Sequence, residues 1–449
     1  MADSLLLLTP NTARIRIATR AAACAALPVA VGAATGHTAT GLIASTGSLA
    51  ALYSADGTPR REAFTVGTAA AALVVSLAAG ALVAQQAWLG VAVTTVWTAL
   101  VSYGCVALAA RPPGMMMFVL VCTLGTVLPG NLGTVITATA ASAAAATLLT
   151  VADQAWRTRR APKPVAGRES RARAAARVTF ALNPAGSPFV FMAVRSAGAV
   201  AAAGSAAVIA GLERPYWAMV TAAAVLNRGN QSGTATGRAA QLLLGTLVGC
   251  LLAAALVLTH PRAWAAALAL AALTFLTEMF VSRNYALAMV FVTPMALLLV
   301  DAAGPAQPVG PLLASRVGET VLGCAAALAA SHAVTRRWAL RHQHRALAAV
   351  LRTSADILSA SEPAGAQQRL GRLAAAVQQL EMVSERTRNE RRGISAATAP
   401  LHDSARNALD RAGELLRRAT HAVPDHAAAH VLRAEALVID PRVRSRGAA

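Results

Sequence analysis

The chain has 449 residues, of which 56% are hydrophobic and only 13% are charged. Soluble domains usually carry about 25% charged residues and disordered chains are poor in apolar residues, so this composition argues against a soluble globule and excludes intrinsic disorder. The formal net charge of +20 is typical of a nucleic-acid-binding protein or of a membrane protein, in which basic loops fix the orientation. Five cysteines in a chain of this length do not indicate a disulfide framework.

Long segments without charge indicate membrane-spanning helices. Residues 63–110 and 112–152, for example, contain no Asp, Glu, Lys or Arg apart from the single Arg111 between them. A bilayer core accommodates about 20 apolar residues as a helix, the form that satisfies the backbone polar groups in lipid. We therefore expect ten to twelve spans, of which 38–54, 114–130 and 215–228 are short. The approximate spans are 19–36, 38–54, 64–84, 87–110, 114–130, 132–152, 190–212, 215–228, 239–259, 263–282, 285–302 and 314–335.

Basic residues lie mainly in alternate loops, which predicts the orientation. Only three arginines, Arg214, Arg262 and Arg316, belong to the opposite set of loops. The positive-inside rule then places both termini and the central linker in the cytoplasm of a multi-pass plasma-membrane protein. The residues of the basic set are Arg14, Arg16, Arg20, Arg60, Arg61, Arg111, the linker residues from Arg157 to Arg177, Arg228, Arg238 and Arg283.

Similar residues recur in the same order in two halves of the chain. Arg60 stands seven residues before Gly67, and Arg238 stands seven residues before Gly245. Arg20 and Arg195 begin equivalent spans, and Trp156 and Trp338 close the halves. We predict an all-α polytopic membrane protein with two similar six-span halves in a parallel repeat, as in many transporters. The alternative is chance similarity between Ala-, Gly- and Leu-rich segments.

Four regions follow from this pattern. Residues 1–152 form the first membrane half and 190–335 the second, joined by the basic linker 153–189. The linker is either a solvated loop or, over 168–182, an amphipathic helix on the inner leaflet. The tail 336–449 holds 19 Arg and 11 Asp or Glu. Its apolar residues recur at helical spacing, which predicts a cytosolic domain of three or four helices.

Residues 213–252 read "ERPYWAMVTAAAVLNRGNQSGTATGRAAQLLLGTLVGCLL" and carry a family resemblance. This segment resembles the fusaric-acid-resistance-like membrane proteins (FUSC), related to the aromatic acid exporters. Family members often have Pro or Asp where this chain has Asn227 and Arg228. The resemblance implies a transporter domain, with export of aromatic or other weak organic acids as the best-known activity. The matching residues are Tyr216, Trp217, Thr221, Arg238, Gly245, Thr246, Gly249, Asn284, Tyr285, Thr293 and Pro294.

Some of these residues suit the recognition of an organic anion. Tyr216 and Trp217 begin a span and form either an interfacial anchor or an aromatic wall of a substrate pathway. Arg228 and Arg238 flank "GNQSGTATG", so they either belong to a basic loop or receive a carboxylate from the cytosol. Thr221, Arg283, Asn284 and Tyr285 complete the candidate substrate-pathway residues.

Two acidic residues inside spans have alternative interpretations. Glu278 either serves a proton-coupled carrier or pairs with Arg283 near the interface, because an intramembrane carboxylate is costly. Glu319 is three residues from Arg316, a spacing at which the two side chains can pair on one helix face.

Pairs of glycines four residues apart predict close helix packing. Gly32 and Gly36 form one pair, and Gly245 and Gly249 form the other.

The sequence contains no Walker, dinucleotide, nucleophile-elbow or HExxH motif, so we expect no enzyme, no cofactor and no metal site. The favoured function is secondary, ion-gradient-driven efflux of aromatic or other amphipathic organic acids. An organic-anion channel or uniporter, and a membrane scaffold that acts through its basic tail, are the alternatives. The expected partners are the lipid bilayer and a small organic anion, not nucleic acid; a homo-oligomer or an accessory protein is left open.

Overall fold

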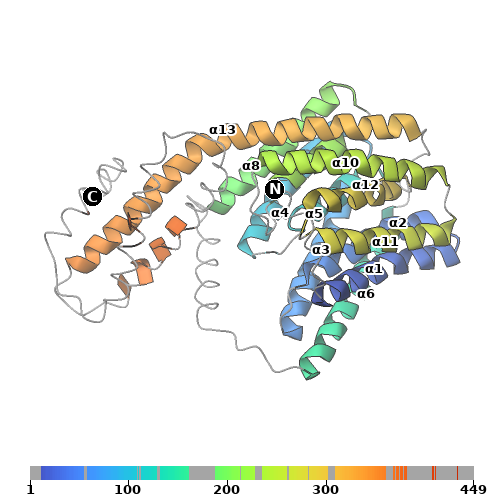
Figure 1. Ribbon diagram of the computed structural model, residues 1–449, viewed down its shortest axis with the longest axis horizontal. Coiled ribbons are helices and arrows are strands. Elements are labelled where there is room, and N and C mark those ends of the chain that lie inside the picture. Colours follow the sequence, from blue (N-terminus) through green and yellow to red (C-terminus); the bar gives the residue numbers. More distant parts are fainter. Residues whose placement is uncertain are drawn as a thin grey trace. The chain divides into compact units, whose positions relative to one another are not determined.

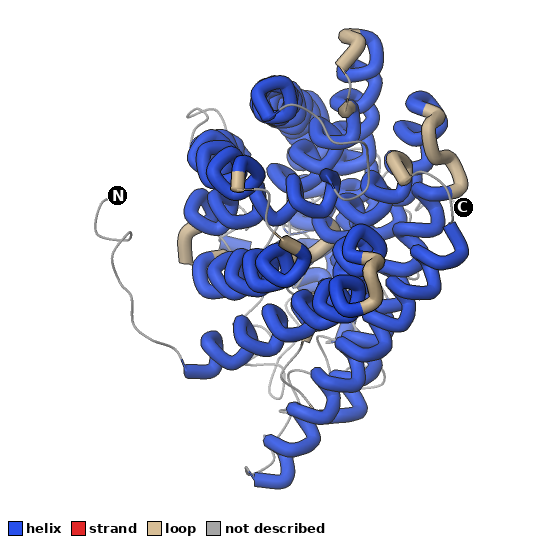
Figure 2. The backbone as a smooth tube through the Cα atoms, turned by 90° about the vertical axis from the view of Figure 1, so that its right-hand side faces the viewer, coloured by secondary structure: helices blue, strands red, loops and turns tan. Residues whose placement is uncertain are grey.

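The computed structural model describes residues 12–54, 58–108, 110, 113–128, 132–160, 188–212, 214–227, 235–259, 262–281, 283–301 and 309–359, with a few more between 368 and 432. All regular secondary structure in these residues is helical (Figure 2). Many of the helices are long and apolar, so the prediction of an all-α polytopic membrane protein is confirmed.

Each predicted span coincides with a helix (Figure 1). The first half contains α1 (Thr12–Ala34), α2 (Thr38–Ser48), the 3-10 helix η1 (Leu49–Tyr53), α3 (Pro59–Ala81), α4 (Ala87–Ala107), α5 (Met116–Gly125) and α6 (Leu132–Arg160). The second half contains α8 (Pro188–Ile209), α9 (Pro215–Leu226), α10 (Ala235–Leu258), α11 (Ala263–Phe280), α12 (Tyr285–Asp301) and α13 (Val309–Leu358).

The span count needs a correction, because only eight of the described helices are long and apolar enough to cross a membrane. The others, α2, α5, α9 and α12, have 11, 10, 12 and 17 residues. At about 1.5 Å per residue, the first three of these rise only about 15–18 Å, roughly half of a bilayer core. A hydropathy pattern cannot separate such a half-length helix plus its loop from a complete span.

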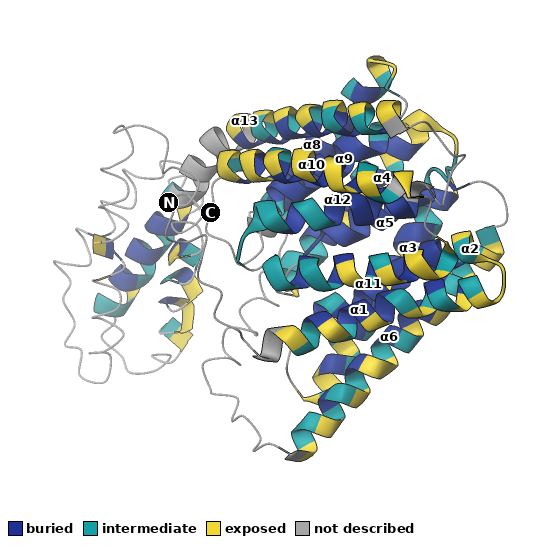
Figure 3. Ribbon diagram, turned by 45° about the vertical axis from the view of Figure 1, so that its right-hand side comes forward, coloured by how far each residue is buried: buried dark blue, intermediate teal, exposed yellow. Residues whose placement is uncertain are grey.

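The short helices α5 and α9 lie inside the protein. Every residue of α5 is buried, and so is every residue of α9 after Pro215 (Figure 3). A helix that is apolar on all sides is stable only when protein surrounds it. Backbone groups at the ends of such helices are tolerated within a bilayer only where protein or a cavity covers them. The protein therefore has short helices with buried ends in its interior, an arrangement found at the binding sites of secondary transporters.

Helices from the two halves pack together in the first compact unit, which comprises Met1–Gln231 and Ala235–Ser331. The long helix α1 packs on α11, and α4 packs on α8 (Figure 1). The short helices α5 and α9 also meet. A two-half repeat would produce this order of contacts; the repeat itself stays a prediction.

Asn227 joins the ends of α5 and α9. Its Nδ2 donates a hydrogen bond to the carbonyl oxygen of Pro113 over 2.5 Å, and its Oδ1 accepts one from the backbone N–H of Met115 over 3.3 Å. The Arg238 guanidinium donates to the carbonyl oxygen of Asn227 itself. Side chains thus bond the Asn227 carbonyl oxygen at this end of α9 and the backbone groups that precede α5.

The second compact unit comprises Ser232–Thr234 and His332–Ala449. In it, Leu373 and Leu380 are fully buried in an apolar core with Leu347 and Leu351 of α13. Most of the predicted tail helices lie outside the described residues, so their number stays a prediction. Residues 153–160 of the predicted linker extend α6, and residues 161–187 lie outside the described residues.

Candidate functional site

The short helix α9 begins with an aromatic pair that is buried. Pro215 occupies the first turn, where its missing N–H has no cost. Trp217 is only 1% exposed and Tyr216 is also buried, with ring centroids 5.3 Å apart. An interfacial anchor would place such rings among the lipid headgroups. Their burial therefore favours the alternative interpretation, in which they line an internal site.

A buried arginine of α13 stacks on this pair. The Arg316 guanidinium lies 4.1 Å from the centre of the Trp217 ring, and Arg316 is 5% exposed. Its Nε and Nη1 have no hydrogen-bond partner among the described residues. A cation over an indole face is stabilised by about 2 kcal/mol when it is desolvated, which offsets only part of the cost of burying the charge. The remaining donors are available to an anion.

A buried carboxylate lies next to this cation. Glu319 follows Arg316 by three residues on α13 and is 0% exposed. The two side chains interact electrostatically, and Glu319 also interacts electrostatically with the Tyr216 hydroxyl. We refer to Tyr216, Trp217, Arg316 and Glu319 as the Arg316 cluster. It combines aromatic faces, a cation and a carboxylate beside a large core of apolar side chains.

A glycine brings α13 close to α9 beside the cluster. A Cβ added to Gly323 would lie 2.6 Å from the Cβ of Thr221, which is too close for any larger residue. The Thr221 hydroxyl is buried and has no hydrogen-bond partner among the described residues. Thr221 therefore presents a polar group one helical turn beyond Trp217.

A second basic group lies at the opposite end of α9. Arg238 of α10 and Arg195 of α8 are both buried, and they interact electrostatically with each other. Arg238 also interacts with Tyr285 of α12, whose buried hydroxyl has no hydrogen-bond partner among the described residues. We refer to Arg195, Arg238 and Tyr285 as the Arg238 cluster. The two clusters bracket α9, so an anion that moves along this helix would meet a cation at each end.

Among the other predicted site residues that the structure describes, Arg283 and Asn284 directly precede Tyr285, and Glu278 lies on α11. Asn284 caps α12, because its Oδ1 accepts a hydrogen bond from the Leu287 backbone N–H over 3.2 Å. Arg283 lies in the short connection that precedes this cap. Glu278 is buried on α11, which packs on α1 and α12. Arg228 lies outside the described residues.

The glycine predictions divide into packing and turn positions. A Cβ on Gly245 would lie 2.6 Å from the Met289 Cβ, and one on Gly249 would lie 2.7 Å from the Thr293 Cβ, so both hold α10 against α12. Gly32 faces the backbone of His37 at 2.7 Å in the same way. The prediction for Gly36 is wrong: it has a φ of +77° in open space and serves the turn after α1.

In the sequence, Arg195 was recognisable as a repeat marker, and Arg316 as a loop arginine that can pair with Glu319. Both residues lie within or next to predicted spans, 190–212 and 314–335. The general cost of a charge in the membrane would have been the signal that they face a site in the protein interior.

Comparisons with known proteins find similarity in the part of the chain that holds the Arg316 cluster. Residues 197–330, which include every member of the Arg316 cluster, match the family model described as fusaric acid resistance protein-like. YvaC of Bacillus subtilis (strain 168), described as an uncharacterized membrane protein, is 29% identical over 172 residues, which cover 38% of this chain and 27% of YvaC. No solved structure is similar to the chain. The predicted resemblance is therefore confirmed: residues 197–330 of the chain are similar to the fusaric acid resistance protein-like family.

Proposed function

We propose that the protein is a secondary transporter that exports aromatic or other amphipathic organic acids. The observation that carries this proposal is the buried Arg316 guanidinium, which stacks on Trp217 and keeps Nε and Nη1 available. Guanidinium is the side-chain group best suited to a carboxylate, and aromatic walls accept the apolar body of such an acid. The site lies on a short buried helix, as substrate sites in secondary transporters commonly do.

In this proposal the protein lies in the plasma membrane with both termini and the basic linker in the cytoplasm. The Arg238 cluster receives the anion at the cytoplasmic end of α9, and the Arg316 cluster binds it further along the same helix. The negative potential of the cell interior favours outward movement of an anion by about 2.3 kcal/mol per 100 mV. A proton moving inward would add to this driving force.

The proposal is tested by transport in proteoliposomes. The full chain is reconstituted, and efflux of benzoate, cinnamate and hexanoate is measured with and without unlabelled acid on the opposite side. We expect saturable efflux and counterflow for at least one aromatic acid. Substrate-driven current without counterflow would indicate an organic-anion channel instead, and no flux with any acid would favour the scaffold.

Proton coupling is expected to depend on Glu278 rather than on Glu319. Glu319 interacts with Arg316 at the anion site, whereas Glu278 lies on a different helix, α11, where a proton can bind separately from the anion. We expect Glu278→Gln to abolish the response of efflux to an imposed proton gradient while leaving downhill efflux in place. Glu319→Gln, the matched variant, should change the KM for the acid and keep the gradient response. An unchanged response of Glu278→Gln to the proton gradient would show that Glu278 does not carry the coupling proton.

A further inference from the structure

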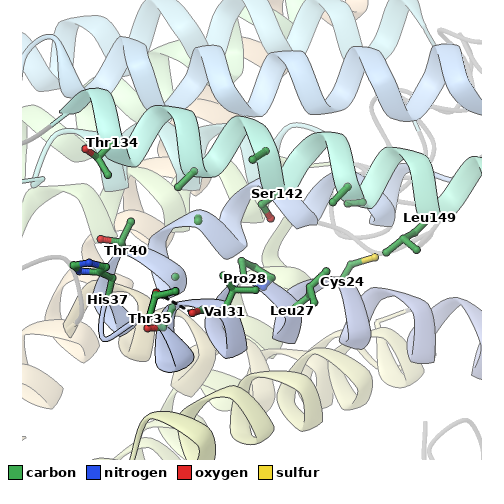
Figure 4. A pocket seen from close by; sticks show the side chains of 17 residues that line it. Cys24, Leu27, Pro28, Val31, Thr35, His37, Thr40, Thr134, Ser142 and Leu149 are labelled. Atoms are coloured by element: carbon green, nitrogen blue, oxygen red, sulfur yellow. Dashed lines mark hydrogen bonds between the residues drawn. The ribbon is translucent and has the colours of Figure 1, made fainter.

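An apolar groove of about 410 Å³ lies in the first half, between α1, α2 and α6 (Figure 4). Small side chains such as Ala138 and Ala145 form much of its wall, and Leu27, Val31 and Leu149 stand at its sides. Thr35, His37, Thr40 and Thr134 gather at one end, and Ser142 lies about midway along the groove. The groove lies away from the Arg316 cluster, which is built by α9 and α13.

The groove opens on the outer surface of the helices. Leu27 and Val31 line it and remain 48% and 54% exposed. On a membrane-spanning helix, exposed leucine and valine side chains face lipid. Between Cys24 and Thr35 the groove follows α1 for about 16 Å at 1.5 Å per residue. That length is close to half of a bilayer core of about 30 Å, the depth that one acyl chain occupies.

Basic residues stand one helical turn beyond the other end of the groove, where Cys24 and Leu149 lie. Arg20 Nη1 of α1 forms an ion pair with Asp153 Oδ2 of α6 over 2.9 Å, and Arg16 Nε lies 3.8 Å from the same oxygen. The single Asp153 carboxylate thus interacts with two guanidinium groups. Buried Nε and Nη2 of Arg20 have no hydrogen-bond partner among the described residues. This end of the groove has an excess of positive charge and free donors for an anion.

We propose that this groove binds an anionic phospholipid, with one acyl chain between α1, α2 and α6 and the phosphate at Arg16 and Arg20. The alanine, leucine and valine side chains along most of the groove match the acyl chain in polarity, and the arginine pair matches the headgroup in charge. Arginine also offers the donor geometry that phosphate accepts. The site is a structural lipid site and is separate from the proposed transport pathway.

The first experiment measures lipid retention by native mass spectrometry of the full chain in detergent. We expect one phosphatidylglycerol molecule to stay bound, with at least tenfold weaker retention of phosphatidylcholine. Ala145→Leu should fill the groove and remove the bound lipid, whereas the control Ala255→Leu, at an exposed position of α10, should retain it. Equal retention of both lipids, or full retention in Ala145→Leu, would overturn the proposal.

The second experiment tests the headgroup contact. Arg20→Gln should reduce the preference for phosphatidylglycerol over phosphatidylcholine by at least fivefold. If this variant fails to fold, Arg16→Gln serves instead, because the Arg16 side chain is 40% exposed and less embedded. Oleate is the comparison for a single-chain anion: retention as strong as that of phosphatidylglycerol would show that the groove takes fatty acids and contradict the phospholipid assignment.

Discussion

Replacing Arg316 by methionine is expected to reduce acid efflux by about 10- to 100-fold, because a lost hydrogen bond to a charged group costs about 1.5–3 kcal/mol. The variant removes the only group of the Arg316 cluster that carries positive charge. Arg316→Lys keeps the charge but loses the planar face that stacks on Trp217, so an intermediate loss is expected. The measurement is kcat/KM for efflux of the best acid. Arg262→Gln, at an exposed position, is the control and should transport normally.

Loss of folding could imitate this result, so the prediction includes a double variant. Arg316→Met alone removes a cation that interacts with the buried Glu319 carboxylate, and removing one partner of a buried charge pair is expected to destabilise the protein by about 3–5 kcal/mol. Arg316→Met with Glu319→Leu removes both charges, and such replacements are often neutral or stabilising. We expect the double variant to recover thermal stability and to remain inactive. Efflux at the normal rate from the double variant would show that the cluster is structural only.

Composition was sufficient to predict the helices but not the length of each one. Long uncharged segments must form helices in lipid, so all the predicted spans correspond to helices. The loop from Thr126 to Leu128 is as apolar as α5, which precedes it. Hydropathy alone therefore extends a short helix into a complete span. Whether a helix is lipid-facing or enclosed depends on its neighbours, which a one-dimensional pattern does not contain.

The Arg316 cluster shows the same limit at the level of the site. Sequence reasoning identified the aromatic pair and the Arg316–Glu319 spacing, but as separate features with separate explanations. They meet because Gly323 allows α13 to approach α9 at Thr221. The local sequence around Gly323 does not indicate which helix will pack against it. The prediction that Asn284 belongs to the substrate pathway came from the family resemblance, whereas Arg283 was a candidate because of its place among the basic loop residues. The hydrogen bond of Asn284 gives it a local role as a helix cap.

The helices that the predicted repeat would pair carry different side chains. In the second half, α9 and α13 contribute Trp217, Arg316 and Glu319 and leave a polar, enclosed cluster. In the first half, α2 and α6 contribute Thr40, Ala138 and Ala145 and leave an open apolar groove. If the halves are related by a repeat, the second half holds the proposed anion site at the position where the first half holds the proposed lipid groove. The Arg316 and Ala145 variants separate these roles, because each should affect one readout only.

The second large effect is expected at the contact between α10 and α12. Gly245→Ala would place a methyl group 2.6 Å from the Met289 Cβ and against the Ala286 carbonyl oxygen, so the two helices must move apart. Overpacking of this kind costs about 1–3 kcal/mol, and α12 carries Tyr285 of the Arg238 cluster. We expect a lower apparent Tm in detergent together with reduced efflux.

Gly104→Ala is the matched control on α4, where a Cβ meets nothing within 4 Å. Alanine there should keep or raise the Tm, since it is favoured over glycine in a helix by about 1 kcal/mol. Equal Tm values for the two variants would show that α10 and α12 do not depend on close backbone contact.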